Sequence, residues 1–235
     1  MDELRGDHHV HSTFSDDAVS TLAENVAAAH AAGLTELRLV DHVRADTTWV
    51  PEFLAAVATL EVPEGLTVHT GVETKILDAS GALDLPGGVD AVDRILIADH
   101  QFPGDDGPWS PSATIERLAR GLAVDDALDL LIGGLVGAMR RHPGNQLAHC
   151  FSILPKVGLD EGQLGVERLE AWAHTAAATD TLVEVNEKWA CPGPAAIAAA
   201  RAAGVRLVAS TDAHVASDVG RYDRVVALLG GEAPS

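Results

Sequence analysis

Two histidines spaced two residues apart, His9 and His11, lie near the start of the sequence in the stretch DHHVHS. If this stretch forms a strand, its two faces carry Asp7, His9 and His11 on one side and His8 and Val10 on the other. Two imidazoles on the same face of a strand can chelate a single metal ion. We therefore expect His9 and His11 to form part of a metal site, and we exclude His8 from it.

Further metal-ligand residue types recur along the chain, each at the carboxyl end of a short apolar run. In the loop after the first run, Ser12 and Ser15 precede Asp16, which can reach the same ion or its neighbour. The later runs end in these residues: His42, Glu73, His100, His149, Asp212 and His214. Parallel strands of a β/α barrel bring their carboxyl ends to one rim, so the repeated placement predicts such a barrel with one shared site.

Strands and helices alternate through the whole sequence, which predicts an α/β fold. The expected strands are 7–11, 37–40, 66–72, 94–98, 146–149, 182–186 and 206–211. The expected helices are 19–32, 51–60, 111–141 with a break near Gly121 or Gly133-Gly134, 160–178, 194–203 and 222–229. Because no Ser/Pro-rich linker divides the chain, we expect one domain over residues 1–235.

Composition limits the classes of partner. The formal charge of −19 argues against a protein that holds nucleic acid on a broad basic surface. The two cysteines, Cys150 and Cys191, are too few and too far apart for a disulfide framework, which favours the cytoplasm. Residues 1–6 lack the apolar core of a signal peptide, and the apolar stretch 121–139 contains aspartates that are costly in a bilayer. We expect a cytoplasmic protein without a membrane partner, and the sequence leaves its oligomeric state open.

Together these motifs resemble the PHP (polymerase and histidinol phosphatase) family, in particular its small stand-alone phosphoesterases. The matching pieces, in chain order, are DxHxHS at 7–12, Ser15-Asp16, Asp41-His42, Gly71-x-Glu73, His100, His149 and Asp212-Ala213-His214. The resemblance implies a distorted (β/α)7, TIM-like barrel with up to three divalent ions at the carboxyl rim. It assigns one ion to His9, His11, Glu73 and Asp212, a second to Glu73, His100 and His149, and a third to Asp16, His42 and His214.

A ligand set of imidazoles and carboxylates without thiolates suits zinc, manganese or iron, and we expect two to three such ions per chain. A trinuclear centre of this kind can lower the pKa of a bridging water, so that hydroxide attacks a phosphate ester near neutral pH. The other ions would neutralise charge on the phosphate and the leaving oxygen. The expected catalytic residues are the bridging Glu73 and, as proton donors to the leaving alcohol, Asp16 or His214.

Three cations follow strands at the expected rim and are candidates for binding the substrate phosphate. They are Arg44, Lys75 and Lys188, and an ordinary solvated charge is the alternative for each. We favour Lys188, because it leaves its strand directly and the adjacent Trp189 could wall the pocket. The remaining histidines, His30, His69, His142 and His174, are expected to be structural or solvent-facing.

The leading hypothesis is a metal-dependent phosphatase, a phosphoric ester hydrolase acting on a small phosphorylated metabolite. Histidinol phosphate is a candidate through the family resemblance. The first alternative is a phosphodiesterase or 3′ exonuclease on nucleotides or single-stranded DNA, against which the acidic balance and the lack of a polymerase domain weigh. The second alternative is a non-catalytic, metal-binding regulatory module.

Overall fold

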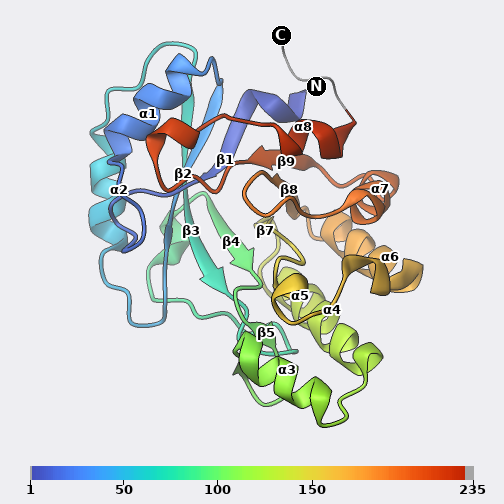
Figure 1. Ribbon diagram of the computed structural model, residues 1–235. Helices are drawn as coiled ribbons and strands as arrows, with labels where there is room; N and C mark the ends of the chain where they lie inside the picture. Colours follow the sequence, from blue (N-terminus) through green and yellow to red (C-terminus); the bar gives the residue numbers. More distant parts are fainter. Residues whose placement is uncertain (1, 231–235) are drawn as a thin grey trace.

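The computed structural model describes residues 2–230, which form a curved parallel sheet surrounded by helices (Figure 1). Met1 and residues 231–235, at the two ends of the predicted domain 1–235, lie outside the described residues. Seven strands make the sheet, in the order β1 (Gly6–Val10), β2 (Glu36–His42), β3 (Thr67–Lys75), β4 (Arg94–Ala98), β7 (Gln146–Ala148), β8 (Leu182–Asn186) and β9 (Leu207–Ser210). Every paired neighbour in this sheet is parallel.

The sheet curls until its first and last strands meet, so that it is nearly closed into a barrel. The junction is an isolated parallel bridge between Val10 and Ala213, beyond the end of β9. His11 N donates to Ala213 O over 2.8 Å at this bridge. The α/β barrel of seven parallel strands predicted from the sequence is therefore confirmed, and its closure lies beside the His9 and His11 pair.

Helices follow the strands and cover the outside of the sheet (Figure 1). They are α1 (Leu22–Ala31), α2 (Val50–Ala58), α3 (Pro111–Ala119), α4 (Val124–Arg141), α5 (Ile153–Lys156), α6 (Gly165–Ala178), α7 (Pro194–Ala202) and α8 (Arg224–Leu229). Short 3-10 turns occur at Asp2–Arg5, Val89–Ala91, Glu161–Gln163 and Ala216–Asp218. A two-strand hairpin, β5 (Phe102–Pro103) with β6 (Pro108–Trp109), lies between β4 and α3.

Local sequence explains where the helices begin and end. Thr21 and Glu24 form a capping box that starts α1, since the Thr21 hydroxyl accepts from Glu24 N while the Glu24 carboxylate accepts from Thr21 N. The predicted helix over 111–141 is broken near Gly121, whose φ of +108° suits glycine. α4 then runs through Gly133 and Gly134 without a break.

Part of the barrel interior is apolar. Val40, Leu96, Ala98 and Ala148, from β2, β4 and β7, are each fully buried and form a separate small core. Gly71 belongs to the same level, because a Cβ there would lie 3.1 Å from both Val40 Cγ2 and Leu96 Cδ1. The polar side chains of Gln146 and Glu184, which are also fully buried, fill the neighbouring part of the interior.

The strict side-chain alternation predicted for the first strand is wrong. The pairing of β1 with β2 shifts register between Asp7 and Val10, which is a bulge. Asp7 turns away from the histidine pair and accepts from Thr211 N at 3.0 Å and from Thr211 Oγ1 at 2.5 Å. His8 lines a cavity at the amino-terminal end of the barrel, while Val10 packs on the outer core near Leu22. The exclusion of His8 from the histidine pair's site holds all the same.

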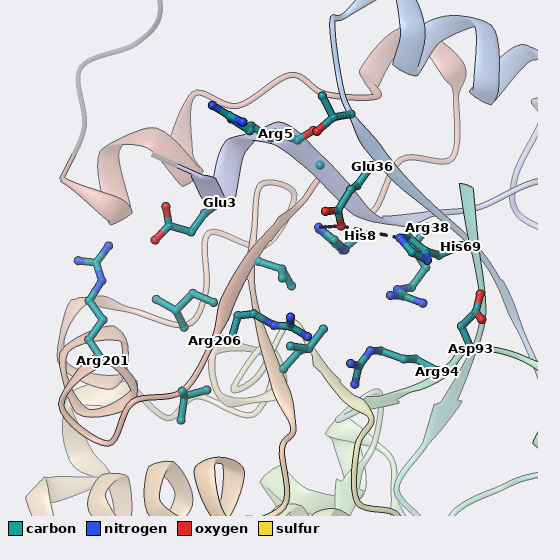
Figure 2. A pocket seen from close by; sticks show the side chains of 16 residues that line it. Glu3, Arg5, His8, Glu36, Arg38, His69, Asp93, Arg94, Arg201 and Arg206 are labelled. Carbon is teal, nitrogen blue, oxygen red and sulfur yellow. Dashed lines mark hydrogen bonds and ion pairs between the residues drawn. The ribbon is translucent and has the colours of Figure 1, made fainter. Parts of the chain in front are cut away.

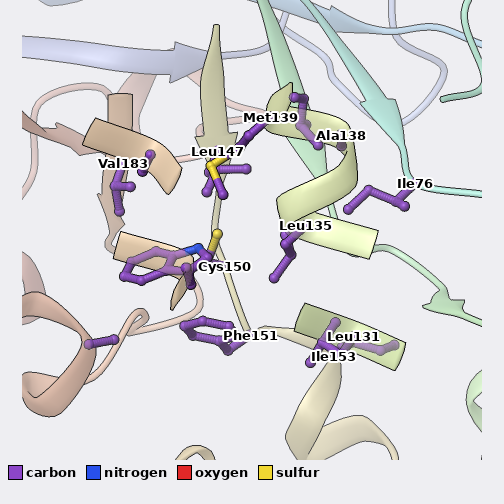
Figure 3. Packing of buried hydrophobic residues seen from close by; sticks show 14 of the residues in the cluster. Ile76, Leu131, Leu135, Ala138, Met139, Leu147, Cys150, Phe151, Ile153 and Val183 are labelled. Atoms are coloured by element: carbon purple, nitrogen blue, oxygen red, sulfur yellow. The ribbon is translucent and has the colours of Figure 1, made fainter. Parts of the chain in front are cut away.

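The main core lies between the sheet and α4, α5 and α6. Figure 3 shows Leu131 and Leu135 of α4 facing Cys150, Phe151 and Leu147, all fully or almost fully buried. The apolar stretch 121–139 lies mostly in α4, whose apolar face is buried in this core while its aspartates are exposed. Within residues 2–230, no helix is both long enough and apolar enough to cross a membrane.

Candidate metal centre at the carboxyl rim

The carboxyl ends of six strands bring their polar side chains to one place. His9 and His11 come from the end of β1, His42 from β2, Glu73 from β3, and His100, His149, Asp212 and His214 from just beyond β4, β7 and β9. Their ligand atoms form four overlapping groups, and within each group they lie within 4.8 Å of one another. The structure thus brings together eight of the nine residues predicted as metal ligands.

Glu73 stands at the centre of this arrangement. Its Oε1 lies 2.8 Å from His149 Nε2 and 3.0 Å from His100 Nε2. Its Oε2 lies 2.9 Å from His42 Nδ1 and 3.2 Å from His9 Nε2. One carboxylate therefore faces imidazoles with both of its oxygens, which is the placement a bridging ligand requires.

A second group lies beside the barrel closure. His9 Nε2 is 2.9 Å from His11 Nε2, and His11 Nε2 is 3.2 Å from Asp212 Oδ1. Asp212 has a positive φ of 53° and His149 one of 28°. Backbones of this kind are uncommon outside glycine and concentrate at functional sites.

The third group differs from the prediction in its carboxylate. Asp17 Oδ2 lies 3.4 Å from His42 Nε2 and 3.2 Å from His214 Nε2. Asp16 is exposed and lines the adjoining cavity, but among the described residues it makes no hydrogen bond or ion pair with the histidines. The structure brings the neighbouring Asp17 to the position expected of Asp16.

The loop that carries Asp17 is held by Asp41. The Asp41 carboxylate accepts from Ser12 N at 2.9 Å, Ser12 Oγ at 2.6 Å, Ser15 N at 3.0 Å and Ser15 Oγ at 2.6 Å. Ser15 Oγ in turn accepts from His42 N at 3.0 Å. These bonds fold residues 12–17 into a tight turn, and the turn decides which of the two adjacent aspartates faces the histidines.

Glu184 is a buried residue of the site that the sequence analysis missed. It lies inside β8, and its carboxylate accepts hydrogen bonds from His149 N at 2.6 Å, Gln146 Nε2 at 2.9 Å and Asn186 Nδ2 at 2.9 Å. Its Oε2 also lies 3.1 Å from His9 Nδ1, which fixes the ring whose Nε2 faces Glu73. A carboxylate in the middle of an otherwise apolar strand was the available signal, since buried carboxylates are rare unless paired.

His149 has a comparable support on its other nitrogen. Ser152 Oγ lies 3.2 Å from His149 Nδ1 and donates to Asp99 Oδ1 over 2.8 Å. Hydrogen bonds of this kind fix the tautomer and orientation of imidazoles that bind metals. Neither Ser152 nor Asp99 was predicted as part of the site.

The predicted substrate cations lie at two rim cavities. Lys188 Nζ is 3.4 Å from Asp212 Oδ2 and 3.3 Å from His214 Nδ1, at a cavity of about 330 Å³ that Arg221 also lines. Arg44 and Lys75 line the other cavity, of about 400 Å³. Lys75 is paired with Asp84 at 3.2 Å, which leaves Lys188 as the predicted cation in closest contact with the ligand groups.

The charges of the site shift its pKa values. Burial opposes the charged form of His9, but the carboxylates of Glu184 and Glu73 outweigh it and raise the pKa of His9 well above its usual value. Burial acts on His149 in the same way, yet hydrogen bonds to Asp99 and Glu73 raise its pKa to about 10. Protons therefore compete with metal ions for these nitrogens, so metal affinity should rise with pH.

The donor set fits divalent metal ions. A tetrahedral ion with ligands at roughly 2.0–2.1 Å separates its ligand atoms by about 3.3 Å. The pairs His11–Asp212, His9–Glu73 and His11–Glu73 are separated by 3.2, 3.2 and 3.4 Å. Moreover, Glu73 Oε2 is buried and accepts no well-aligned hydrogen bond from the described residues. A cation satisfies such an oxygen better than any neighbouring side chain here does.

The fold and the site define a class: parallel α/β barrels with a histidine and carboxylate metal centre at the carboxyl rim. Comparison with known protein families narrows this class. The family model for the PHP domain matches residues 7–188, and the chain belongs to this family.

Named relatives span most of the chain. A probable phosphatase of Caldanaerobacter subterraneus subsp. tengcongensis is 28% identical over 95% of this chain and 81% of its own length. A probable phosphatase of Pectobacterium carotovorum is 27% identical over 95% of this chain and 84% of its own length.

A solved structure shares the fold. Histidinol phosphate phosphatase from Lactococcus lactis, complexed with zinc, L-histidinol and phosphate, superposes with a TM-score of 0.68 at 16% identity. The match covers 94% of this chain and 89% of that one. At this identity the likeness supports the barrel architecture.

Proposed function

We propose that this protein is a metal-dependent phosphatase that hydrolyses a phosphomonoester of a small metabolite. The observation that carries the proposal is the convergence of imidazoles and carboxylates on Glu73 at the rim. The names of the relatives as probable phosphatases and the zinc-containing histidinol phosphate phosphatase of the same fold support it.

The chain offers three overlapping metal positions. His9, His11 and Asp212 with Glu73 would hold the first ion, and Glu73 with His100 and His149 the second. His42 and His214 would hold the third, with Asp17 as the carboxylate that faces them. Divalent ions bound there would supply positive charge for the phosphate and would lower the pKa of water. Zinc, manganese and iron all suit this donor set.

The residues around these positions would bind the phosphate and supply a proton. Lys188 places a partly exposed ammonium beside Asp212, where it can contact a phosphate oxygen. When the oxygen of water bonds to phosphorus, the bond to the leaving alcohol breaks and that alcohol requires a proton. We assign this proton to the Asp17–His214 pair, whose atoms lie 3.2 Å apart at the outer edge of the rim, in the protein that holds ions at the first two positions only.

The rim cavities indicate a small substrate. Their volumes of about 330 and 400 Å³ lie at the low end of the range for small-molecule sites. The net charge of −19 disfavours a long polyanion such as single-stranded DNA. We therefore place a small phosphomonoester, of which histidinol phosphate is one candidate, ahead of an oligonucleotide.

The test combines metal analysis with phosphate release. The assay compares wild type with His9→Ala and Asp212→Ala on a panel of phosphomonoesters, phosphodiesters and single-stranded DNA. His174→Ala is the control, because His174 is exposed on α6. We expect monoester turnover with bound metal in wild type and in the control, and turnover reduced by about 100-fold or more in the two site variants.

Two results would contradict the proposal. One is cleavage of phosphodiesters or DNA without monoester turnover, which would assign the protein to the phosphodiesterase class. The other is a fully metal-loaded protein with no hydrolysis across the panel, which would favour the regulatory module.

A further inference from the structure

A second polar cavity lies at the opposite end of the barrel from the metal centre. It has a volume of about 850 Å³ and is lined by residues at the starts of the strands, among them Gly6, Glu36, Arg94 and Leu207. We call it the amino-terminal mouth. Fully buried side chains of the barrel interior lie between it and the rim, among them the apolar Val40 and Leu96 and the polar Gln146 and Glu184.

The mouth concentrates positive charge in a strongly acidic protein. Five of the chain's sixteen arginines and lysines line it, all of them arginines: Arg5, Arg38, Arg94, Arg201 and Arg206. They face three carboxylates, Glu3, Glu36 and Asp93. In a chain with a formal charge of −19, this local excess of cations stands out.

Asp93 and Glu36 offset the charge of Arg38 only in part, and among the described residues none of the three carboxylates forms an ion pair within 4 Å with Arg38, Arg94 or Arg206. Asp93 accepts from Thr70 N at 2.7 Å and from Thr70 Oγ1 at 3.0 Å. Glu36 lies 3.7 Å from His8 and 3.8 Å from His69. Figure 2 shows Glu3 toward the edge that carries Arg201, away from the central group.

Three guanidinium groups make up the central group. Figure 2 shows Arg94 and Arg206 reaching into the cavity from opposite sides, with Arg38 above Arg94. Arg38 is only 4% exposed, and burial together with the charge of Arg94 lowers its pKa to about 10. Like charges held close together in this way raise the free energy of the folded protein unless an anion compensates them.

Two buried polar atoms at the mouth also lack partners. Arg38 donates from Nη1 to Thr70 O at 3.1 Å, but its Nε has no hydrogen-bond partner among the described residues. The Nδ1 atom of His8, a residue that is 7% exposed, has none among them either. Buried polar atoms normally find a hydrogen-bond partner, so each unpaired atom requires an explanation.

A structural role explains only part of this arrangement. Arg94 donates to the carbonyl oxygens of Gly144 and Asn145, and Arg38 to that of Thr70, so both arginines brace the strand ends. Bracing accounts neither for the unpaired Arg38 Nε nor for Arg206. Arg206 is exposed, and its charge acts on both other arginines of the central group.

We propose that the amino-terminal mouth binds a small anion that carries a phosphate group, at a site separate from the metal centre. Guanidinium groups bind phosphate through paired, charge-assisted hydrogen bonds, which a buried point charge such as lysine cannot reproduce. The cavity has room for inorganic phosphate and for a phosphorylated metabolite. The proposal does not depend on the activity at the rim.

The test is calorimetric titration of the metal-loaded protein with inorganic phosphate. We expect two binding events per chain in wild type, one at the rim and one at the mouth. Arg206→Gln should weaken the mouth event about tenfold and Arg206→Glu should abolish it, while Asp212→Asn should remove only the rim event. Arg206 is suited to substitution because it is exposed, and Arg140→Gln, on the exposed end of α4, is the matched control.

A parallel titration uses methylphosphonate, which has the shape and charge of a phosphomonoester but no ester bond to hydrolyse. Comparing the two titrations distinguishes a site for free phosphate from one for a phosphorylated compound. Saturable binding of either anion that depends on Arg206 supports the proposal and identifies the better ligand. A single event that Arg206→Glu leaves unchanged would overturn it, whatever the outcome of the hydrolysis assays. Loss of all binding in Asp212→Asn would overturn it too.

Discussion

Replacing Glu184 by glutamine tests how far the site depends on a residue that contacts no substrate. The carboxylate is fully buried and accepts hydrogen bonds from His149 N, Gln146 Nε2 and Asn186 Nδ2. Its fourth neighbour is His9 Nδ1, at 3.1 Å. Glutamine keeps the shape but turns one acceptor oxygen into an NH2 donor.

No orientation of the new amide satisfies these donors. If the NH2 group takes the Oε1 position, it faces the donors His149 N and Asn186 Nδ2 and can accept from neither. If it takes the Oε2 position, it faces Gln146 Nε2 and His9 Nδ1 instead. A flip of Gln146 could relieve the second case, but it would break the bond from Gln146 Nε2 to His8 O. The His9 ring would also be pushed toward the tautomer with its proton on Nε2, the atom that faces Glu73.

The magnitude follows from these contacts. Two lost hydrogen bonds to a charged group, at about 1.5–3 kcal/mol each, predict roughly 3–6 kcal/mol of lost stability in the metal-free protein. Loss of a carboxylate behind a metal-binding imidazole predicts about 10–100-fold weaker metal affinity. Turnover at limiting metal should fall by the same factor and should recover in part when metal is added in excess.

The assay is a metal titration of phosphate release, with chemical denaturation of the chelated protein in parallel. Glu170→Gln is the matched control, because Glu170 is exposed on α6. If Glu184→Gln kept the metal affinity and turnover of wild type to within about twofold, the argument from donors and tautomers would be refuted.

Three further substitutions and conditions test other parts of the site. Asp17→Asn should lower kcat about tenfold or more while Asp16→Asn changes it little, because only Asp17 faces the rim histidines; equal effects in a steady-state assay would contradict the geometry. Lys188→Ala should raise KM several-fold with a smaller change in kcat, since it removes a cation beside the ligand groups, and unchanged kinetics would exclude it from the phosphate site. His149 has a pKa of about 10 in the folded chain, above its usual value near 6.5, so its protonation stabilises the metal-free protein. This contribution, a few kcal/mol at most, is fully present below pH ~6.5 and is lost as the pH rises toward 10. Denaturation curves of chelated protein across this range should show the decline in wild type and in His174→Asn, and a flatter profile in His149→Asn.

The barrel itself was predictable from the sequence because each strand is a short apolar run between turn signals. β8 was predicted with its observed bounds, Leu182–Asn186. β3 was predicted to end at Val72 but continues to Lys75, since the ladder with β4 extends along polar residues that no apolar pattern marks. The β1 bulge was not predictable either, because a register shift depends on pairing with β2 rather than on local sequence.

The same contrast applies to the site. Ligand types at strand ends could be found from the sequence, since the barrel places every strand end at one rim. The choice between Asp16 and Asp17 could not, because it depends on how the distant Asp41 folds their loop. Glu184 was missed because its role is set by partners on three other segments, which only the folded chain brings together.

The polarity of the fold gives the two ends of the barrel opposite tasks. The helices outside run antiparallel to the strands, so their positive amino ends point toward the rim and their negative carboxyl ends toward the mouth. At the rim, that field favours the carboxylates Glu73 and Asp212 and an incoming phosphate. At the mouth, it favours cations, and Arg201 in the last turn of α7 is one example.

The field alone does not explain why Arg38, Arg94 and Arg206 share one cavity, because helix ends favour single cations and do not offset the repulsion among three. An anion bound among them would offset that repulsion, so its binding should also stabilise the fold, by an amount that grows with its concentration.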